Sequence, residues 1–167
     1  MARTILWATI IASIAALLQS TLLARLAIFN TVPDLTLGVL VYVAYVNGSM
    51  TGQVTGFTSG IALDFLSASP LGFNALIRTI VGALTGMLKG TFFLDVVILP
   101  FVLCAVATLV KALIAALASF LFAGAVPAYD LGTPTLWIEM AYNAVSAPAL
   151  FAFLNLFKAV LKPRQVG

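Results

Sequence analysis

The chain has no histidine, a single cysteine and few charged residues, and each scarcity excludes a class of function. Without histidine, and with five acidic residues scattered along 167 positions, no metal site of ordinary ligand spacing can be drawn. No serine or cysteine is paired with a histidine base, and no glycine-lysine motif is present that would hold a phosphate. Cys104, alone and in an apolar run, excludes an internal disulfide and is interpreted as a small hydrophobic residue. We therefore expect no enzyme, no metal and no cofactor.

Apolar residues, by contrast, are abundant. They make up 63% of the chain against 8% charged, which lies outside the range of soluble domains and indicates an integral membrane protein. No stretch outside the apolar segments is long enough to fold alone, so residues 1–167 are expected to form a single membrane domain. The net charge of +3 is interpreted as a sign of orientation in the membrane rather than of nucleic-acid binding.

Six apolar segments predict an all-α membrane protein with six transmembrane helices in one compact bundle. They lie at about residues 4–24, 33–47, 52–68, 71–88, 95–122 and 134–160. The first exceeds the roughly 7 to 15 residues of a signal-peptide core and is predicted to be retained. The second is shorter than the roughly 20 residues that cross a bilayer, so we expect a thinned, broken or partly re-entrant span. The fifth carries Pro100 and is predicted to be tilted or kinked.

The distribution of basic residues predicts that both termini face the cytoplasm. This orientation leaves only Arg25 in an outer loop. It places five basic residues on the cytoplasmic side, namely Arg3, Lys89, Lys158, Lys162 and Arg164. The reverse topology would place the basic carboxyl-terminal segment outside, against the positive-inside rule.

Small residues recur at four-residue spacing in three of the predicted helices and so line one stripe of each. The positions are Ala8, Ala12 and Ala16; Gly52, Gly56 and Gly60; and Gly82, Gly86 and Gly90. Between the two glycine ladders, residues 67–72 are turn formers that include Pro70 and Gly72, which predicts a helical hairpin. Small-residue ridges let helices approach closely in lipid. We interpret them as packing surfaces within the bundle, with docking of a partner on the alanine ridge as the alternative.

Four charged residues are predicted to converge in the outer half of the membrane, namely Asp34, Asp64, Arg78 and Glu139. Counted from the hairpin turn, Asp64 and Arg78 differ in depth by about 4 to 5 Å at 1.5 Å per residue, a gap that an arginine can cover. An ion pair between these two, locking the hairpin, is the favoured interpretation. A binding or gating cluster, or a site for a partner, is the alternative.

Lys111 lies near the middle of the fifth segment without an evident partner in the sequence. It is predicted to point inward, toward an acid, a backbone carbonyl or a water-filled gap, because a lysine facing lipid is costly. Asn143 and Asn155 in the last segment are interpreted as hydrogen-bonding residues that support helix packing.

Pro33-Asp34 opens the short second segment, Gly52 to Asp64 forms the third, and a turn at residues 67–72 follows. Together these features resemble the rod shape-determining protein MreD family of bacteria, over roughly residues 33–90. The matching acid, proline and glycine positions are Pro33, Asp34, Asp64, Pro70 and Gly72.

The resemblance implies a multi-pass inner-membrane subunit of the cell-elongation machinery that works beside the single-span protein MreC. Through this pair, cytoplasmic MreB filaments would be connected with the peptidoglycan polymerase RodA and a class B penicillin-binding protein. The resemblance also implies an architecture similar to the substrate-binding subunits of energy-coupling-factor vitamin transporters.

Two functions therefore remain open. The favoured one is a non-enzymatic scaffold for peptidoglycan synthesis and cell shape, which binds a partner at the outer polar cluster. The alternative is a transport subunit that binds a small, vitamin-type solute in the same region and docks on a transport motor through Ala8, Ala12 and Ala16. The scaffold is favoured because few aromatic residues, Phe65, Phe73 and Trp137, accompany the charges.

Overall fold

The computed structural model describes residues 2–21, 31–67, 69–91, 97–122 and 132–161, and these residues form helices without a strand. The helices are α1 (Ala2–Thr21), α2 (Leu35–Asn47), α3 (Ser49–Leu66), α4 (Phe73–Met87), α5 (Ile98–Leu121), α6 (Pro134–Leu156) and α7 (Lys158–Leu161). The all-α prediction is confirmed, and the six predicted segments coincide with these helices to within a few residues, the last being divided into α6 and α7. Residues 22–24 of the first predicted segment, and Arg25, Lys162 and Arg164 of the orientation argument, lie outside the described residues.

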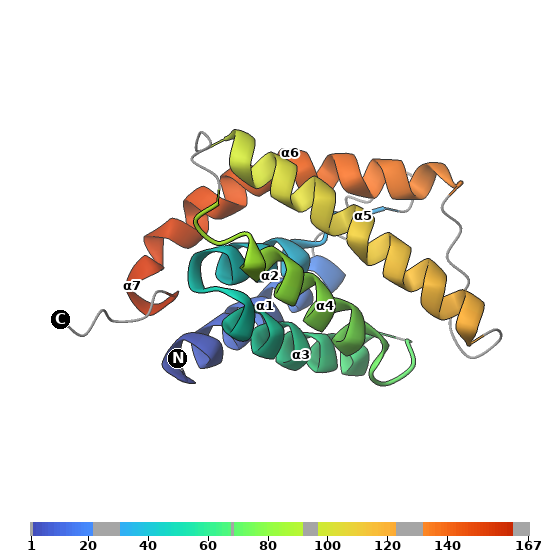
Figure 1. The fold of residues 1–167 in the computed structure, drawn as a ribbon, viewed down its shortest axis with the longest axis horizontal. Helices are drawn as coiled ribbons and strands as arrows, with labels where there is room; N and C mark the ends of the chain where they lie inside the picture. Colours follow the sequence, from blue (N-terminus) through green and yellow to red (C-terminus); the bar gives the residue numbers. More distant parts are fainter. Residues whose placement is uncertain (1, 22–30, 68, 92–96, 123–131, 162–167) are drawn as a thin grey trace.

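Helix α2 lies at the centre of the molecule and contacts α1, α3, α4, α5 and α6 (Figure 1). Its side chains are buried around the whole circumference, as the consecutive residues Val39, Leu40 and Val41 show. A helix that is apolar on every face is typical of such a position. The predicted break or re-entrant turn is not found: α2 is one continuous helix of 13 residues. Because protein rather than lipid surrounds it, its length need not match the bilayer.

Helices α3 and α4 form an antiparallel hairpin in which the glycine ladders face each other. A Cβ added at Gly52 would overlap the carbonyl of Gly82, and one at Gly82 would overlap the carbonyl of Gly52. Gly56 lies in the same way against the carbonyl of Arg78. The backbones are therefore as close as glycine permits, which is how helices pack tightly in lipid.

The two ends of the hairpin differ from its middle. At the turn, Gly72 has a φ of 93°, and the N–H of Phe73 donates to the carbonyl of Pro70 at 3.1 Å. At the other end, the predicted ladder of Gly82, Gly86 and Gly90 includes one glycine too many. Gly90 lies beyond the last residue of α4 with no atom within 4 Å of an added Cβ, so it takes no part in the interface.

The alanine ridge of α1 faces inward. Ala8, Ala12 and Ala16 are each at most 3% exposed, and Thr9 on the neighbouring stripe shares a hydrogen bond of 2.7 Å with Thr58 of α3. The ridge is covered by the protein's own helices, so the alternative prediction, that it docks on a transport motor, is wrong.

Helices α5 and α6 lie together on one side of the α1–α4 group, with α5 crossing it obliquely (Figure 1). Pro100 is the third residue of α5, where its missing N–H has no partner within the helix, so it requires no kink there. The short α7 follows the carboxyl end of α6 and contacts α1. The start of α1 and the end of α7 therefore lie at the same end of the bundle.

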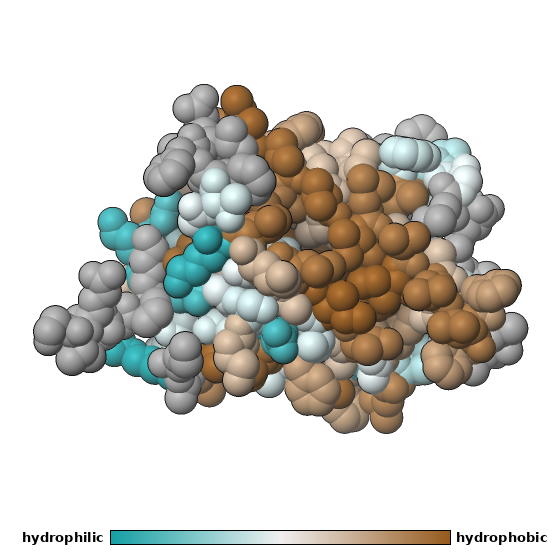
Figure 2. All heavy atoms as spheres, in the orientation of Figure 1, coloured by the Kyte–Doolittle hydropathy of each residue, from teal (hydrophilic) through white to brown (hydrophobic). Residues whose placement is uncertain are grey.

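Large apolar side chains cover much of the surface. The apolar area in the middle of Figure 2 lies where Figure 1 places α4 and α5. Both helices carry exposed apolar side chains, such as Leu84 on α4 and Val106 on α5. Within the described residues, Arg3–Thr21 and Ile98–Leu121 are long and apolar enough to cross a membrane. The apolar helices α2 and α4 are shorter.

Candidate functional site

Asp34 is the central residue of a polar network at one end of α2. It precedes the first residue of the helix and accepts a hydrogen bond from the N–H of Leu37 at 2.9 Å through Oδ1, as an N-cap does. Its own backbone N–H donates to Oδ1 of Asn143 on α6 at 2.6 Å. The start of α2 is thus fixed to α6, and the carboxylate, 5% exposed, is turned into the bundle.

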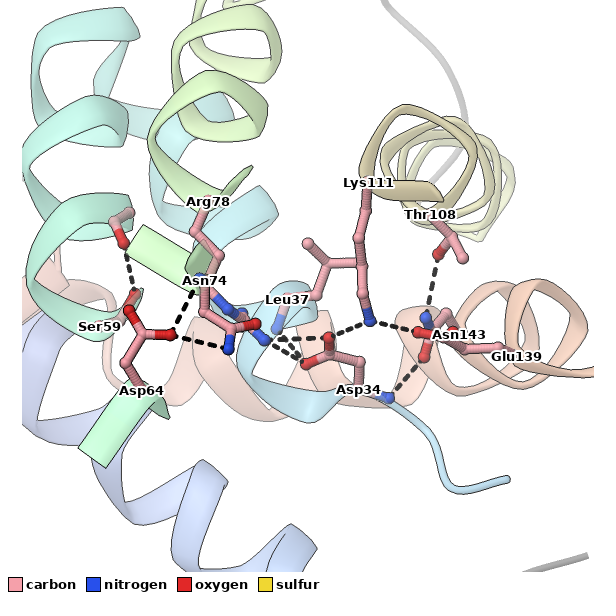
Figure 3. A network of polar contacts seen from close by, with 11 residues as sticks. Asp34, Leu37, Ser59, Asp64, Asn74, Arg78, Thr108, Lys111, Glu139 and Asn143 are labelled. Carbon is pink, nitrogen blue, oxygen red and sulfur yellow. Dashed lines mark hydrogen bonds and ion pairs between the residues drawn. The ribbon is translucent and has the colours of Figure 1, made fainter. Parts of the chain in front are cut away.

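Two cations share this carboxylate. The Nη2 of Arg78, on α4, donates to Oδ1 at 2.9 Å and to Oδ2 at 3.0 Å. The Nζ of Lys111, on α5, donates to Oδ2 at 2.9 Å and also to Oε1 of Glu139 on α6. Figure 3 shows the chain of contacts running from Arg78 through Asp34 and Lys111 to Glu139. We call these four residues the ionic network.

The ionic network joins α2, α4, α5 and α6 and has no net charge, since two carboxylates face two cations. Desolvation of an unpaired charge is far more costly than desolvation of a pair. A neutral, hydrogen-bonded cluster is therefore the form in which charges are tolerated inside a membrane protein. Asn143 extends it, because its Nδ2 donates to Oγ1 of Thr108 on α5 at 2.9 Å.

The predicted ion pair between Asp64 and Arg78 is wrong. Asp64 instead accepts hydrogen bonds at the start of α4: from the backbone N–H groups of Gly72 (2.9 Å) and Ala75 (3.3 Å), and from Asn74. Asn74 contributes both its backbone N–H and its Nδ2, each at 2.9 Å. A carboxylate at a helix N-terminus satisfies N–H groups that have no partner inside the helix.

The physical reason is the register of the hairpin. The carbonyl of Arg78 packs against Gly56 of α3, eight residues before Asp64, which is about 12 Å along the helix at 1.5 Å per residue. Asp64 instead lies beside the start of α4, and the guanidinium of Arg78 reaches Asp34 at the start of α2. The depth counted from the turn therefore underestimated the separation of the two residues. Of the four predicted cluster residues, the structure brings together Asp34, Arg78 and Glu139 and sets Asp64 apart.

Lys111 points inward to acids, as predicted. Asn143 and Thr108 also belong to this site, and neither was predicted as a member of it. A signal was present: Asn143 follows Glu139 by four residues, and Thr108 precedes Lys111 by three, so each lies on the same helix face as a charged member. Asn155, by contrast, accepts a hydrogen bond from the hydroxyl of Tyr42 at 3.0 Å, away from the network.

The ionic network has a closed side and an accessible side. The side chains of Arg78 and Asp34 are 3% and 5% exposed, whereas those of Lys111 and Glu139 are 20% and 11% exposed. Among the described residues, no three His, Cys, Asp or Glu lie close enough to hold a metal ion. The arrangement can hold four helices in register and can present a lysine–glutamate pair to a binding partner.

Comparison with known proteins supports a family assignment. The family model for rod shape-determining protein MreD matches residues 1–157. The matched range extends beyond the motifs at residues 33–90 and includes every member of the ionic network. Comparisons with curated proteins and with solved structures give no match.

Proposed function

The chain belongs to the rod shape-determining protein MreD family, and we propose that it is a non-enzymatic, multi-pass subunit of the bacterial inner membrane that binds MreC. Membership makes it a membrane protein of the shape-determining system. In the proposed role it helps couple MreB filaments to peptidoglycan synthesis by RodA and a class B penicillin-binding protein, directly or through MreC. The family match over residues 1–157 carries this proposal.

The proposed membrane placement uses α1 to α6 as spans of a bundle similar to energy-coupling-factor substrate-binding subunits, with both termini in the cytoplasm. The basic residues Arg3, Lys89 and Lys158 support this orientation, because they lie at the ends of α1, α4 and α6 that it places in the cytoplasm. It puts the ionic network in the outer half of the membrane. The partly exposed pair of Lys111 and Glu139 is then the proposed contact for the membrane-proximal part of MreC, because complementary charges at an interface give specificity.

Solute transport has less support. The ridge that would have docked on a transport motor is buried in the bundle. Phe65 and Trp137 are more than half exposed rather than gathered around the charges. No observation favours a solute over a protein partner at the ionic network.

Depletion and replacement in a rod-shaped host test the cellular role. We expect the wild-type chain to restore cell width after depletion of the resident MreD, and MreC to co-purify with it in mild detergent. Unchanged width on depletion, or a wild-type chain that does not retain MreC, would contradict the proposed function.

A separate variant tests the proposed contact of Lys111 and Glu139 with MreC. Glu139→Gln should lower MreC retention at least about tenfold, which corresponds to a loss of about 1.4 kcal/mol of binding energy. Lys89→Gln is the control, because Lys89 lies at the other end of the bundle, where its Nζ donates to the carbonyl of Asn47 at 3.3 Å. Equal retention by both folded variants would refute the contact while leaving the family role intact.

A further inference from the structure

A lateral groove of about 630 Å³ runs between α1 on one side and α6 with α7 on the other. Residues of α2 lie between them, including Val39. All the lining side chains are apolar, and among them Trp7, Phe153 and Phe157 are 40% or more exposed. The volume lies within the roughly 300 to 1,000 Å³ of small-molecule sites. The lining offers such a ligand no hydrogen bond, so the ligand must be apolar over this length.

The length of the groove distinguishes between apolar ligands. On α1 it extends from Trp7 to Leu18, eleven positions apart. At 1.5 Å per residue this is about 16 Å, close to half of the roughly 30 Å hydrocarbon core. A transmembrane helix of a partner would need a surface across both leaflets, whereas one lipid acyl chain occupies one leaflet.

Charge distinguishes the two ends. Arg3 precedes Trp7 by four residues on the same face of α1, and Lys158 follows Phe157 directly; both side chains are exposed. These two cations lie at the end where α1 contacts α7 (Figure 1). At the opposite end, near Leu35, the neighbouring Asp34 is buried and paired with cations. The groove is therefore apolar along its length and positive at one end.

We propose that this groove binds one acyl chain of an anionic phospholipid, whose phosphate contacts Arg3 and Lys158. Only the choice of leaflet rests on the proposed orientation, which makes it the cytoplasmic one. The site is independent of MreC binding, because the ionic network and the groove use different side chains.

The two tryptophans of the chain, Trp7 and Trp137, allow a direct test. In a Trp137→Phe variant reconstituted into vesicles, Trp7 is the only tryptophan and lies in the groove. Phosphatidylglycerol or phosphatidylcholine with brominated chains is then added at equal mole fraction, and fluorescence quenching is measured. We expect stronger relative binding of phosphatidylglycerol at Trp7, by about fivefold for each of the two basic residues. A Trp7→Phe variant, which reports from Trp137, should show no such preference.

Two further variants separate headgroup from chain. Arg3→Gln with Lys158→Gln changes exposed side chains only and should abolish the preference while leaving quenching itself. Ala15→Phe should fill the groove and reduce quenching of Trp7 by both lipids. Equal quenching by the two lipids before the charges are removed, or a preference that survives their removal, would overturn the proposal. Absence of quenching by either lipid would also overturn it, since the groove would then be filled by protein, either a second copy or a partner helix.

Discussion

Replacing Asp34 with asparagine is the sharpest test of the ionic network. The substitution keeps the size of the side chain and an oxygen that can still accept from the N–H of Leu37, so the cap of α2 is retained. What it removes is the one negative charge that Arg78 and Lys111 share. The network changes from neutral to one net positive charge, while the side chain of Arg78, only 3% exposed, stays out of water.

Removing one partner of a buried ion pair costs about 3 to 5 kcal/mol, because the other charge stays desolvated. Asp34 has two such partners on different helices, which places the expected loss at the upper end of this range. Total stabilities of protein domains are about 5 to 15 kcal/mol. The variant should therefore unfold at a clearly lower denaturant concentration, as measured by titrating the purified protein with SDS in mild detergent and following helicity by circular dichroism.

Asp64→Asn is the matched comparison. Asp64 is similarly buried, and its carboxylate also caps a helix start, that of α4, but its partners are neutral N–H groups. None of the ion pairs among the described residues includes it. Its loss should cost only about 1 to 2 kcal/mol, the value of a charge-assisted cap. Equal destabilisation by the two substitutions, or a larger effect at Asp64, would refute the assignment of the guanidinium to Asp34.

The same assay tests two further predictions about stability. Lys111→Gln and Glu139→Gln each leave the network with a net charge, whereas the double variant leaves a balanced carboxylate–guanidinium pair. A double-mutant cycle should therefore give a coupling energy of about 1 to 3 kcal/mol. Additive losses would contradict the ion pair between Lys111 and Glu139. Gly52→Ala should cost about 1 to 3 kcal/mol because its Cβ would overlap the backbone of α4. Gly90→Asn, at a positive φ that asparagine tolerates and with open space around it, should change stability by less than about 0.5 kcal/mol, and a comparable loss there would argue against the glycine interface.

The helices were predictable because their signals are local. Apolar runs and turn formers define α1 to α6 to within a few residues, and four-residue spacing identifies the faces on which α3 and α4 meet. The position of α2 was not predictable in this way. The length of this short apolar segment, compared with the thickness of the bilayer, suggested a broken or re-entrant span. The same apolar composition also suits a helix enclosed by five others. Hydropathy alone does not separate lipid from protein as the surrounding medium.

In the polar site, the sequence predicted which charged residues lie near one another but not which of them form pairs. Helix rise gives the depth of a residue, and depth correctly placed Asp34, Arg78 and Glu139 near one another. The pairing depends on the register of the two helices, which is set by their packing: the contact of Gly56 with the Arg78 carbonyl places Arg78 about two helical turns from Asp64. The glycine ladder that makes the hairpin tight thus also decides which acid the arginine can reach. Widening the α3–α4 interface should therefore weaken the ionic network as well as the hairpin, so the packing core and the polar site form one structural unit.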